Sequence, residues 1–233
     1  MKKHMFLLLA ALLQAPLATP AFAADQGLNF VPVVVETFTS KYCPNCPAGE
    51  TTLAKYADGR NDFIVVLEHV DYWDNPANKQ IDPLGNPDFT QRQYDYSNRL
   101  GRRPGEVFTP APILDGNNMA TPPLWMGWDG VLEKSMQNNF KVALTLAKKP
   151  DGGLEVTAPK EQKLDGLSLT LLAIEKNPEK PSLWQARAMG IKNISGAVTS
   201  LTRAEVPAGG SHLMVLLQES GGGAVKGMGM VAR

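Results

Sequence analysis

Residues 33–53, VVVETFTSKYCPNCPAGETTL, contain the only two cysteines of the 233-residue chain, Cys43 and Cys46. The stretch opens with a β-branched apolar run, which is typical of a buried strand. From Pro44 to Ala57 the pattern turns helical, with Cys46 and Glu50 on one stripe of the predicted helix. The stretch therefore predicts a strand, then a Cys-x-x-Cys pair at the start of a helix.

The spacing of the two cysteines suits thiol–disulfide exchange better than a structural staple. The stabilisation from a disulfide grows with the number of residues it encloses, and this pair encloses only two. At the start of a helix, the unpaired N–H groups and the positive end of the helix dipole favour a thiolate. We expect Pro44 at the first helical position, Cys43 exposed and nucleophilic, and Cys46 facing inward, where it can resolve a mixed disulfide.

The pattern of alternating elements continues to about residue 139. Turn residues such as Asp58-Gly59 and Asp115-Gly116 separate the predicted elements. These elements are strands at 31–38 and 62–70, a Pro-, Asn- and Asp-rich loop at 71–86, a helix at 88–100, a strand broken by prolines within 107–120 and a helix at 122–139.

After about residue 140 the chain changes to alternating apolar and polar residues separated by glycine-rich turns. FKVALTLAKKPDGGLEVTAPK, residues 140–160, is typical of a hairpin turned at Asp-Gly-Gly. We therefore expect an α/β fold in two parts, a thioredoxin-like domain with an insertion at 24–139 and a smaller all-β, sandwich-like domain at 140–233. The order strand, Cys-x-x-Cys, helix, strand, helix, Thr-Pro and strand is typical of the first of these.

The first 23 residues have the features of a secretory signal peptide. Lys2 and Lys3 precede a short apolar run, and Ala21-Phe22-Ala23 forms a cleavage pattern. Without these residues the chain has 21 Lys and Arg against 23 Asp and Glu, a net charge of about −2. The scattered basic residues exclude a nucleic-acid footprint. We expect a periplasmic or secreted protein that begins near Ala24, without stable membrane insertion.

Four segments together resemble the domain of unknown function 1223 family, a group of exported thioredoxin-like proteins. They are VVVETFTSKYCPNCP, LEHVDYWD, PDFTQRQYDYSNRLG and VFTPAPILDG, within residues 33–116. The resemblance implies a thioredoxin-like domain, export and a redox role. It also implies a cis proline beside the cysteine pair, for which Pro110 is the best candidate because Thr109 precedes it.

Related oxidoreductases use a buried acid upstream of the cysteines to handle the proton of the inner cysteine, and Glu36 is the candidate here, with Glu68 as its competitor. The alternative for Glu36 is an acid paired with Lys or Arg. For the segment after the second strand, we expect His69 and Asp71 to bind the 71–86 loop and Tyr72 and Trp73 to pack beneath it. Arg92 and Gln93 are expected to tie that loop to its helix.

These features together predict an exported thiol–disulfide oxidoreductase acting on protein or small-thiol substrates. Cys43 would attack, Cys46 would resolve, and Thr109 and Pro110 would shape the substrate groove. No bound cofactor is needed, because the disulfide carries two electrons, but a recycling redox partner, membrane-bound in our expectation, is required. The alternative is a non-catalytic binding module or a copper-binding protein, with ligands drawn from the cysteines, His69 and Met119, Met228 or Met230.

Overall fold

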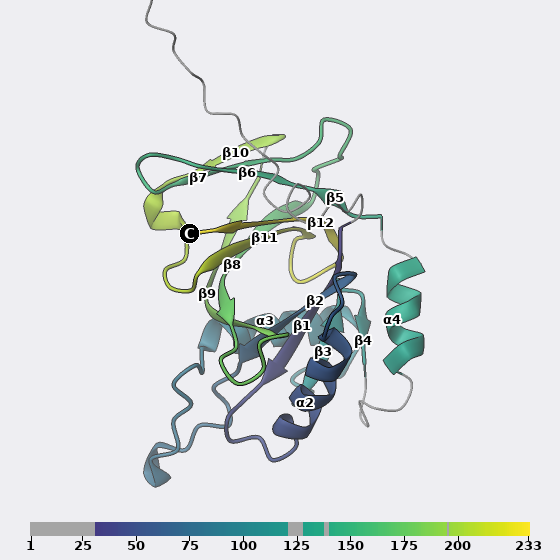
Figure 1. Ribbon diagram of the computed structural model, residues 1–233, viewed down its shortest axis with the longest axis vertical. Coiled ribbons are helices and arrows are strands. Elements are labelled where there is room, and N and C mark those ends of the chain that lie inside the picture. The colour runs from purple at the N-terminus through teal and green to yellow at the C-terminus, as the bar shows by residue number, and fades with distance from the viewer. Residues whose placement is uncertain (1–30, 121–127, 138–139, 195) are drawn as a thin grey trace, which may run out of the picture.

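A large mixed β-sheet runs through the whole protein and is covered by a few helices (Figure 1). The computed structural model describes residues 31–120, 128–137, 140–194 and 196–233. The first half contains strands β1 (Val33–Thr39), β2 (Phe63–His69), β3 (Ala111–Leu114) and β4 (Asn118–Met119) and helices α2 (Cys46–Ala57), η1 (Pro76–Asn78), α3 (Pro87–Arg99) and α4 (Trp128–Gln137). The second half contains β5 (Val142–Ala143), β6 (Thr145–Lys148), β7 (Leu154–Thr157), β8 (Leu167–Lys176), β9 (Trp184–Asn193), β10 (Val198–Leu201), η2 (Arg203–Glu205), β11 (His212–Glu219) and β12 (Val225–Ala232).

Local sequence signals set the ends of the two helices that flank the first strands. Helix α3 starts after Asn86, whose side-chain oxygen accepts a hydrogen bond from the N–H of Asp88. It ends shortly before Gly101, which has a φ of 72° that glycine adopts without steric cost. Helix α2 ends at Ala57, just before Asp58 and Gly59, as the sequence predicts.

The nine strands of the main sheet have the order β4-β3-β1-β2-β9-β8-β11-β12-β5. Strands β1 and β2 are parallel, while β3 is antiparallel to β1 and β4 to β3. The second half joins this sheet through a short parallel contact in which Val66 and Leu67 of β2 pair with Trp184 and Gln185 of β9. The sheet is thus continuous from the first half of the chain to the second.

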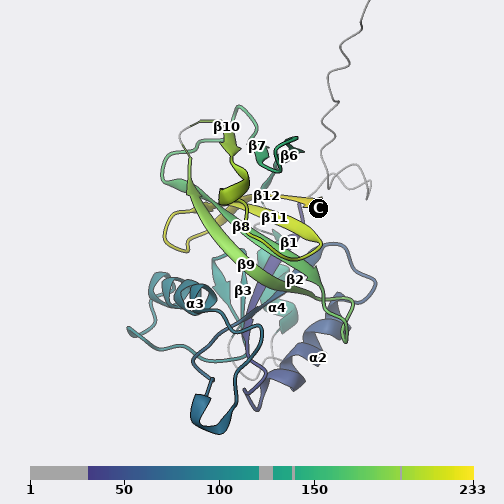
Figure 2. The ribbon, with the colours of Figure 1, turned by 90° about the vertical axis from the view of Figure 1, so that its left-hand side faces the viewer.

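Alternate residues of β1 face opposite sides of the sheet, and a different helix covers each side. Val33 and Val35 pack with Leu53 of α2, whereas Val34 packs with Phe89 of α3. Figure 2 shows α2 and α3 on opposite sides of these strands. Any side chain of β1 can therefore be assigned to the α2 face or the α3 face by its position alone.

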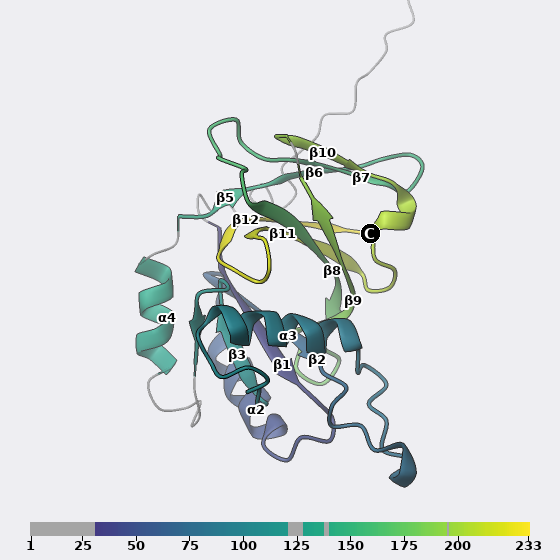
Figure 3. The same ribbon diagram turned by 180° about the vertical axis from the view of Figure 1, so that it is seen from behind.

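The C-terminal part is β-rich, as expected, and the hairpin predicted at 140–160 is present as β6 and β7. Strands β6, β7 and β10 form a separate three-stranded sheet. It lies above β8, β11 and β12 in Figure 3, and leucines and valines from both layers form one core, including Leu146, Val156, Leu171 and Val215. The strands β8, β9, β11 and β12 extend the first sheet instead of forming an all-β layer of their own. No helix among the described residues has the length and apolar character needed to cross a membrane.

Candidate functional site

Cys43 and Cys46 form a disulfide just beyond the C-terminal end of β1, with their Cα atoms 5.4 Å apart. The helix begins at Cys46, two residues later than expected, and Asn45 is its N-cap. The prediction that Pro44 occupies the first helical position is therefore wrong, and Pro47 is the proline of the first turn. Cys46 lies at the helix start and Cys43 in the preceding turn, where its N–H donates to the carbonyl of Ser40 over 3.2 Å.

The prediction that Cys43 is exposed is also wrong. Cys43 is 2 % exposed and Cys46 is fully buried. Cys43 closes a turn with Ser40, and both ends of this turn are buried. The inward position expected for Cys46 is confirmed.

The Thr109–Pro110 peptide bond is cis, as the resemblance implied. Ala111 pairs with Phe38, so Pro110 lies beside the last residue of β1, at the same edge from which the chain continues to Cys43. The Thr109 hydroxyl accepts a hydrogen bond from the indole N–H of Trp73 over 2.7 Å. The cis proline and the disulfide thus share the end of one strand.

Glu36 does not belong to this arrangement. It is an even-numbered residue of β1 and faces α3, whereas Cys46 belongs to the helix on the other side of the sheet. Its carboxylate is fully buried and accepts hydrogen bonds from Arg92 Nε at 2.6 Å and from the hydroxyl of Tyr96. The prediction that Glu36 serves the inner cysteine is therefore wrong, and the alternative of a buried acid paired with a basic residue describes it.

Glu68 faces the same side and completes a buried polar network. It is fully buried, one of its carboxyl oxygens lies 3.8 Å from Arg92 Nε, and neither oxygen accepts a hydrogen bond from the described residues. Burial raises the pKa of Glu68 well above its ordinary value, and the nearby Glu36 carboxylate raises it further. Burial thus favours the protonated, uncharged form of Glu68 beside the Glu36–Arg92 ion pair.

On the face that carries α2, the acid is Glu50. Its carboxylate accepts a hydrogen bond from Thr39 Oγ1 at 2.6 Å and pairs with Lys180 Nζ at 3.1 Å. Glu50 lies one helical turn after Cys46, so both project from the same side of α2. The stripe shared by Cys46 and Glu50 was visible in the sequence. Its connection to Lys180 was not, because the two residues are 130 positions apart.

The 71–86 loop is fastened to the end of β2, to the turn that precedes Cys43 and to α3. Asp82 accepts hydrogen bonds from His69 Nδ1 at 2.8 Å and from the N–H of Lys41 at 2.7 Å. Burial alone would raise the pKa of Asp82, but these bonds and one from the N–H of Leu84 lower it to about 2. Asp71 is bound by Thr90 of α3, so the predicted roles of His69 and Asp71 in holding the loop are confirmed.

Two expectations for the same segment are wrong. Tyr72 and Trp73 are each 37 % exposed instead of being packed beneath the loop, because the hydrogen bonds to their polar tips hold them at the surface. Gln93 does accept a hydrogen bond from the Tyr72 hydroxyl and so links the loop to helix α3, as predicted. Arg92 instead points into the core toward Glu36.

The model of a protein family described as "Protein of unknown function (DUF1223)" matches residues 34–182. The chain belongs to this family. No protein of the curated set matches the chain.

Two solved structures resemble this DUF1223 protein in fold. One is protein AGR_C_4864 from Agrobacterium tumefaciens, with 23 % identity and a TM-score of 0.63 over 88 % of this chain and 96 % of that one. The other is HBP35 of Porphyromonas gingivalis, with 14 % identity and a TM-score of 0.56 over 86 % of this chain and 74 % of that one. At these identities the likeness concerns the fold alone.

The residues considered for copper lie in different parts of this DUF1223 protein. Met228 and Met230 are buried with Met214 in the core beneath α3, and Met119 packs beside Phe38 and Tyr96. Within the described ranges, no three His, Cys, Asp or Glu side chains are grouped as a metal site. The methionine pair of β12 therefore acts as part of a packed sheet face.

Proposed function

We propose that this protein is a thiol–disulfide oxidoreductase exported to the periplasm or the exterior, and that its first part is a thioredoxin-like domain. The observation that carries the proposal is the disulfide at the start of α2, which closes a two-residue loop beside the cis Thr109–Pro110 bond. The strand order β4-β3-β1-β2, with β1 and β2 parallel and the other two antiparallel, supports the thioredoxin-like assignment. Residues 1–23 support export.

The exchange needs no group beyond the two cysteines. In the reduced protein the Cys43 thiolate attacks one sulfur of a substrate disulfide, forms a mixed disulfide and releases the other substrate sulfur as a thiolate. The Cys46 thiolate then attacks Cys43 Sγ, which closes the Cys43–Cys46 disulfide and releases the second substrate thiolate. Two electrons pass from the protein to the substrate, and the same steps in reverse oxidise a substrate dithiol.

Several described groups suit this chemistry. Cys46 starts α2, so its sulfur lies at the positive end of the helix dipole, which favours a thiolate there. Glu50, one turn further along, is a carboxylate on the same side of the helix that can exchange a proton with Cys46 directly or through water. Because Cys43 is covered, attack by or on its sulfur requires the 40–45 segment to move outward.

The substrates proposed are disulfide- or thiol-containing proteins and small thiols, with a membrane-bound redox partner that recycles the protein. The first experiment equilibrates the protein with mixtures of reduced and oxidised glutathione, alkylates the free thiols and measures the reduced fraction. A reduction potential of about −120 mV would indicate that the protein donates disulfides to its substrates, and one of about −270 mV that it reduces them. A pair that never equilibrates overturns the proposal and leaves the non-catalytic binding module.

Two variants identify the attacking sulfur. Cys46→Ala is expected to accumulate a mixed disulfide with glutathione at Cys43, visible in the intact mass, because the resolving thiol is missing. Cys43→Ala, which also leaves one cysteine, is expected to remain unmodified under the same conditions, since Cys46 is held in helix α2 whereas Cys43 lies in the 40–45 segment that moves outward. Equal modification of both variants would contradict the assigned roles.

A further inference from the structure

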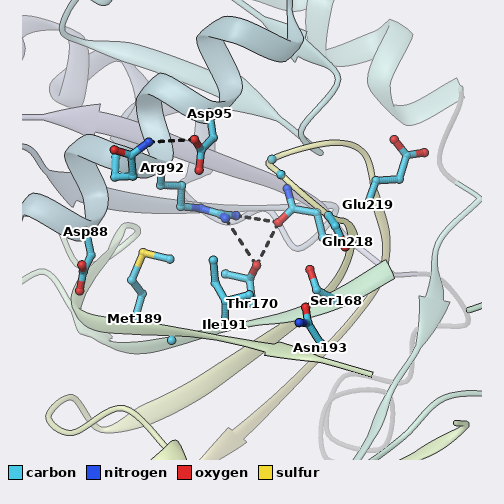
Figure 4. Close-up of a pocket in the computed structure, with 15 residues that line it drawn as sticks. Asp88, Arg92, Asp95, Ser168, Thr170, Met189, Ile191, Asn193, Gln218 and Glu219 are labelled. Atoms are coloured by element: carbon cyan, nitrogen blue, oxygen red, sulfur yellow. Dashed lines mark hydrogen bonds between the residues drawn. The ribbon is translucent and has the colours of Figure 1, made fainter. Parts of the chain in front are cut away.

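A cleft of about 370 Å³ lies between α3 and the strands β8, β9 and β11. Its size is within the range of small-molecule sites. None of the residues that line it belongs to the disulfide site on the α2 side. Figure 4 shows α3 along one wall and the strands along the other, with Arg92, Thr170 and Gln218 between them.

The floor of the cleft is a fixed polar surface. Gln218 Oε1 accepts hydrogen bonds from Arg92 Nη2 at 3.0 Å and from the Thr170 hydroxyl at 3.1 Å. The amide nitrogen of Gln218 donates to the Tyr96 hydroxyl and to the carbonyl of Gly223. Every one of these side chains is held by the buried network around Glu36, so the floor is organised before any ligand arrives.

One hydroxyl that lines the cleft has no partner among the described residues. Ser168 is 5 % exposed, yet its hydroxyl makes no hydrogen bond with any residue that the structure describes. It pairs with Asn193 across the β8–β9 ladder and lies at the end of the cleft away from Asp88 (Figure 4). The Ser168 hydroxyl is therefore available to a hydrogen-bonding ligand in the cleft.

The α3 wall of the cleft carries two carboxylates that form no ion pair within the described residues. The Arg92 cation is already paired with Glu36, and Glu219 is paired with Arg99 and Lys226. The carboxylate of Asp88 forms no ion pair within the described part of the chain, and that of Asp95 accepts only the amide of Gln91. Two carboxylates without a paired cation favour a cationic ligand and oppose phosphates and other anions.

The distance between the Asp88 and Asp95 carboxylates favours an elongated cation with two separated charges. Asp88 and Asp95 lie seven residues apart on α3, so they project from one side of the helix about 10 Å apart. The opposite wall offers the apolar side chains of Met189 and Ile191, of which Ile191 is 61 % exposed. Two negative charges separated along an apolar wall match ammonium groups separated by methylene carbons.

We propose that this cleft binds a linear polyamine. One ammonium group pairs with Asp88 and another with Asp95, the methylene chain lies against Met189 and Ile191, and an N–H of the ligand donates to the unpartnered Ser168 hydroxyl. The proposal is independent of disulfide exchange, since it uses neither cysteine. Spermidine is the probe, because its terminal ammonium groups are a comparable distance apart in the extended chain.

The test titrates spermidine into the oxidised protein by isothermal calorimetry at low ionic strength. We expect saturable binding of one ligand per chain, weakened at least tenfold in Asp88→Asn/Asp95→Asn and a few-fold in Ser168→Ala. The matched control is Asp58→Asn/Glu155→Gln, which removes two exposed carboxylates away from the cleft and leaves the net charge the same as in the first variant. This control is expected to bind within twofold of the unmodified protein.

Three results would overturn the proposal. The first is the absence of saturable binding. The second is equal weakening in the cleft variant and the control, which would mean that net charge alone attracts the polyamine. The third is displacement of spermidine by Mg²⁺ at matched ionic strength as effectively as by another polyamine, which would assign the heat to general ion exchange.

Discussion

Replacing Arg92 by methionine tests the buried network most directly. The guanidinium is 4 % exposed and donates to Glu36 at 2.6 Å, to the Tyr96 hydroxyl at 2.8 Å and to Gln218 at 3.0 Å. Methionine fills much of the same volume but removes the charge, so the Glu36 carboxylate is left buried without its cation. Breaking a buried ion pair in this way costs about 3–5 kcal/mol, a large fraction of the stability of a typical domain.

The assay is urea unfolding of the oxidised protein followed by tryptophan fluorescence. The matched control is Arg99→Met on the same helix, which breaks the Arg99–Glu219 pair at 2.8 Å. The two side chains of that pair are 48 % and 35 % exposed, and the expected loss is therefore about 0–1 kcal/mol. The loss of stability in Arg92→Met should also be smaller at pH 5 than at pH 8. At the lower pH the unpaired Glu36 carboxylate can bind a proton, which removes the cost of burying its charge.

A loss below about 1 kcal/mol in Arg92→Met, or one equal to that of Arg99→Met, would refute the reasoning. Either result would mean that water reaches Glu36 in the folded protein. An unchanged loss between pH 5 and pH 8 would point to packing instead of charge as its source.

Four further substitutions test the same structure. Because the pKa of Glu68 is raised in the folded protein, its carboxyl contributes fully to stability below pH 4.5, and this contribution is lost as the pH rises toward the folded pKa. Above pH 4.5 the free energy of unfolding measured with urea should therefore fall by about 1.4 kcal/mol per pH unit, and this slope should be absent in Glu68→Gln. Asp82→Asn should lower the free energy of unfolding by roughly 1–3 kcal/mol at pH 7 and make the 71–86 loop sensitive to limited proteolysis. This difference should shrink as the pH falls from 3.8 through about 2, because the native Asp82 carboxylate then binds a proton. Gly221→Ala, at a φ of 76° with open space around it, should lower the stability by about 1–2 kcal/mol, whereas Gly210→Ala places a Cβ 2.5 Å from the Ile174 carbonyl and should lose about 1–3 kcal/mol more in the same urea assay.

Local patterns were sufficient to predict the elements that surround the disulfide. The β-branched run of β1, the helical stripe of α2 and the glycines that follow α2 and α3 each reflect interactions within a few residues. The cis bond before Pro110 came from the family resemblance, because most X–Pro bonds are trans. Sequence reasoning thus identified the end of β1 and its cis proline as one region.

The role of Glu36 was predicted wrongly because it depends on partners that are distant in the sequence. A strand residue faces one side of the sheet or the other, and nothing local to Glu36 indicates that α3 covers its side. Arg92 and Gln218, which meet in the same network, are 126 positions apart. The burial of Cys43 was also missed, since it depends on the tertiary surroundings of the 40–43 turn and not on the turn residues alone.

The position of Arg92 also explains how the two halves of the sheet are held together. Their direct junction is short, with only Val66 and Leu67 of β2 paired to β9. Arg92 reaches Glu36 on β1, Thr170 on β8 and Gln218 on β11 from one helix, so its hydrogen bonds span that junction on the α3 face. An apolar residue would pack there, but it would not fix the distance and direction to three strands at once. The buried Arg92 side chain therefore fixes the alignment of α3 on the sheet. It also fixes the floor of the cleft between α3 and strands β8, β9 and β11.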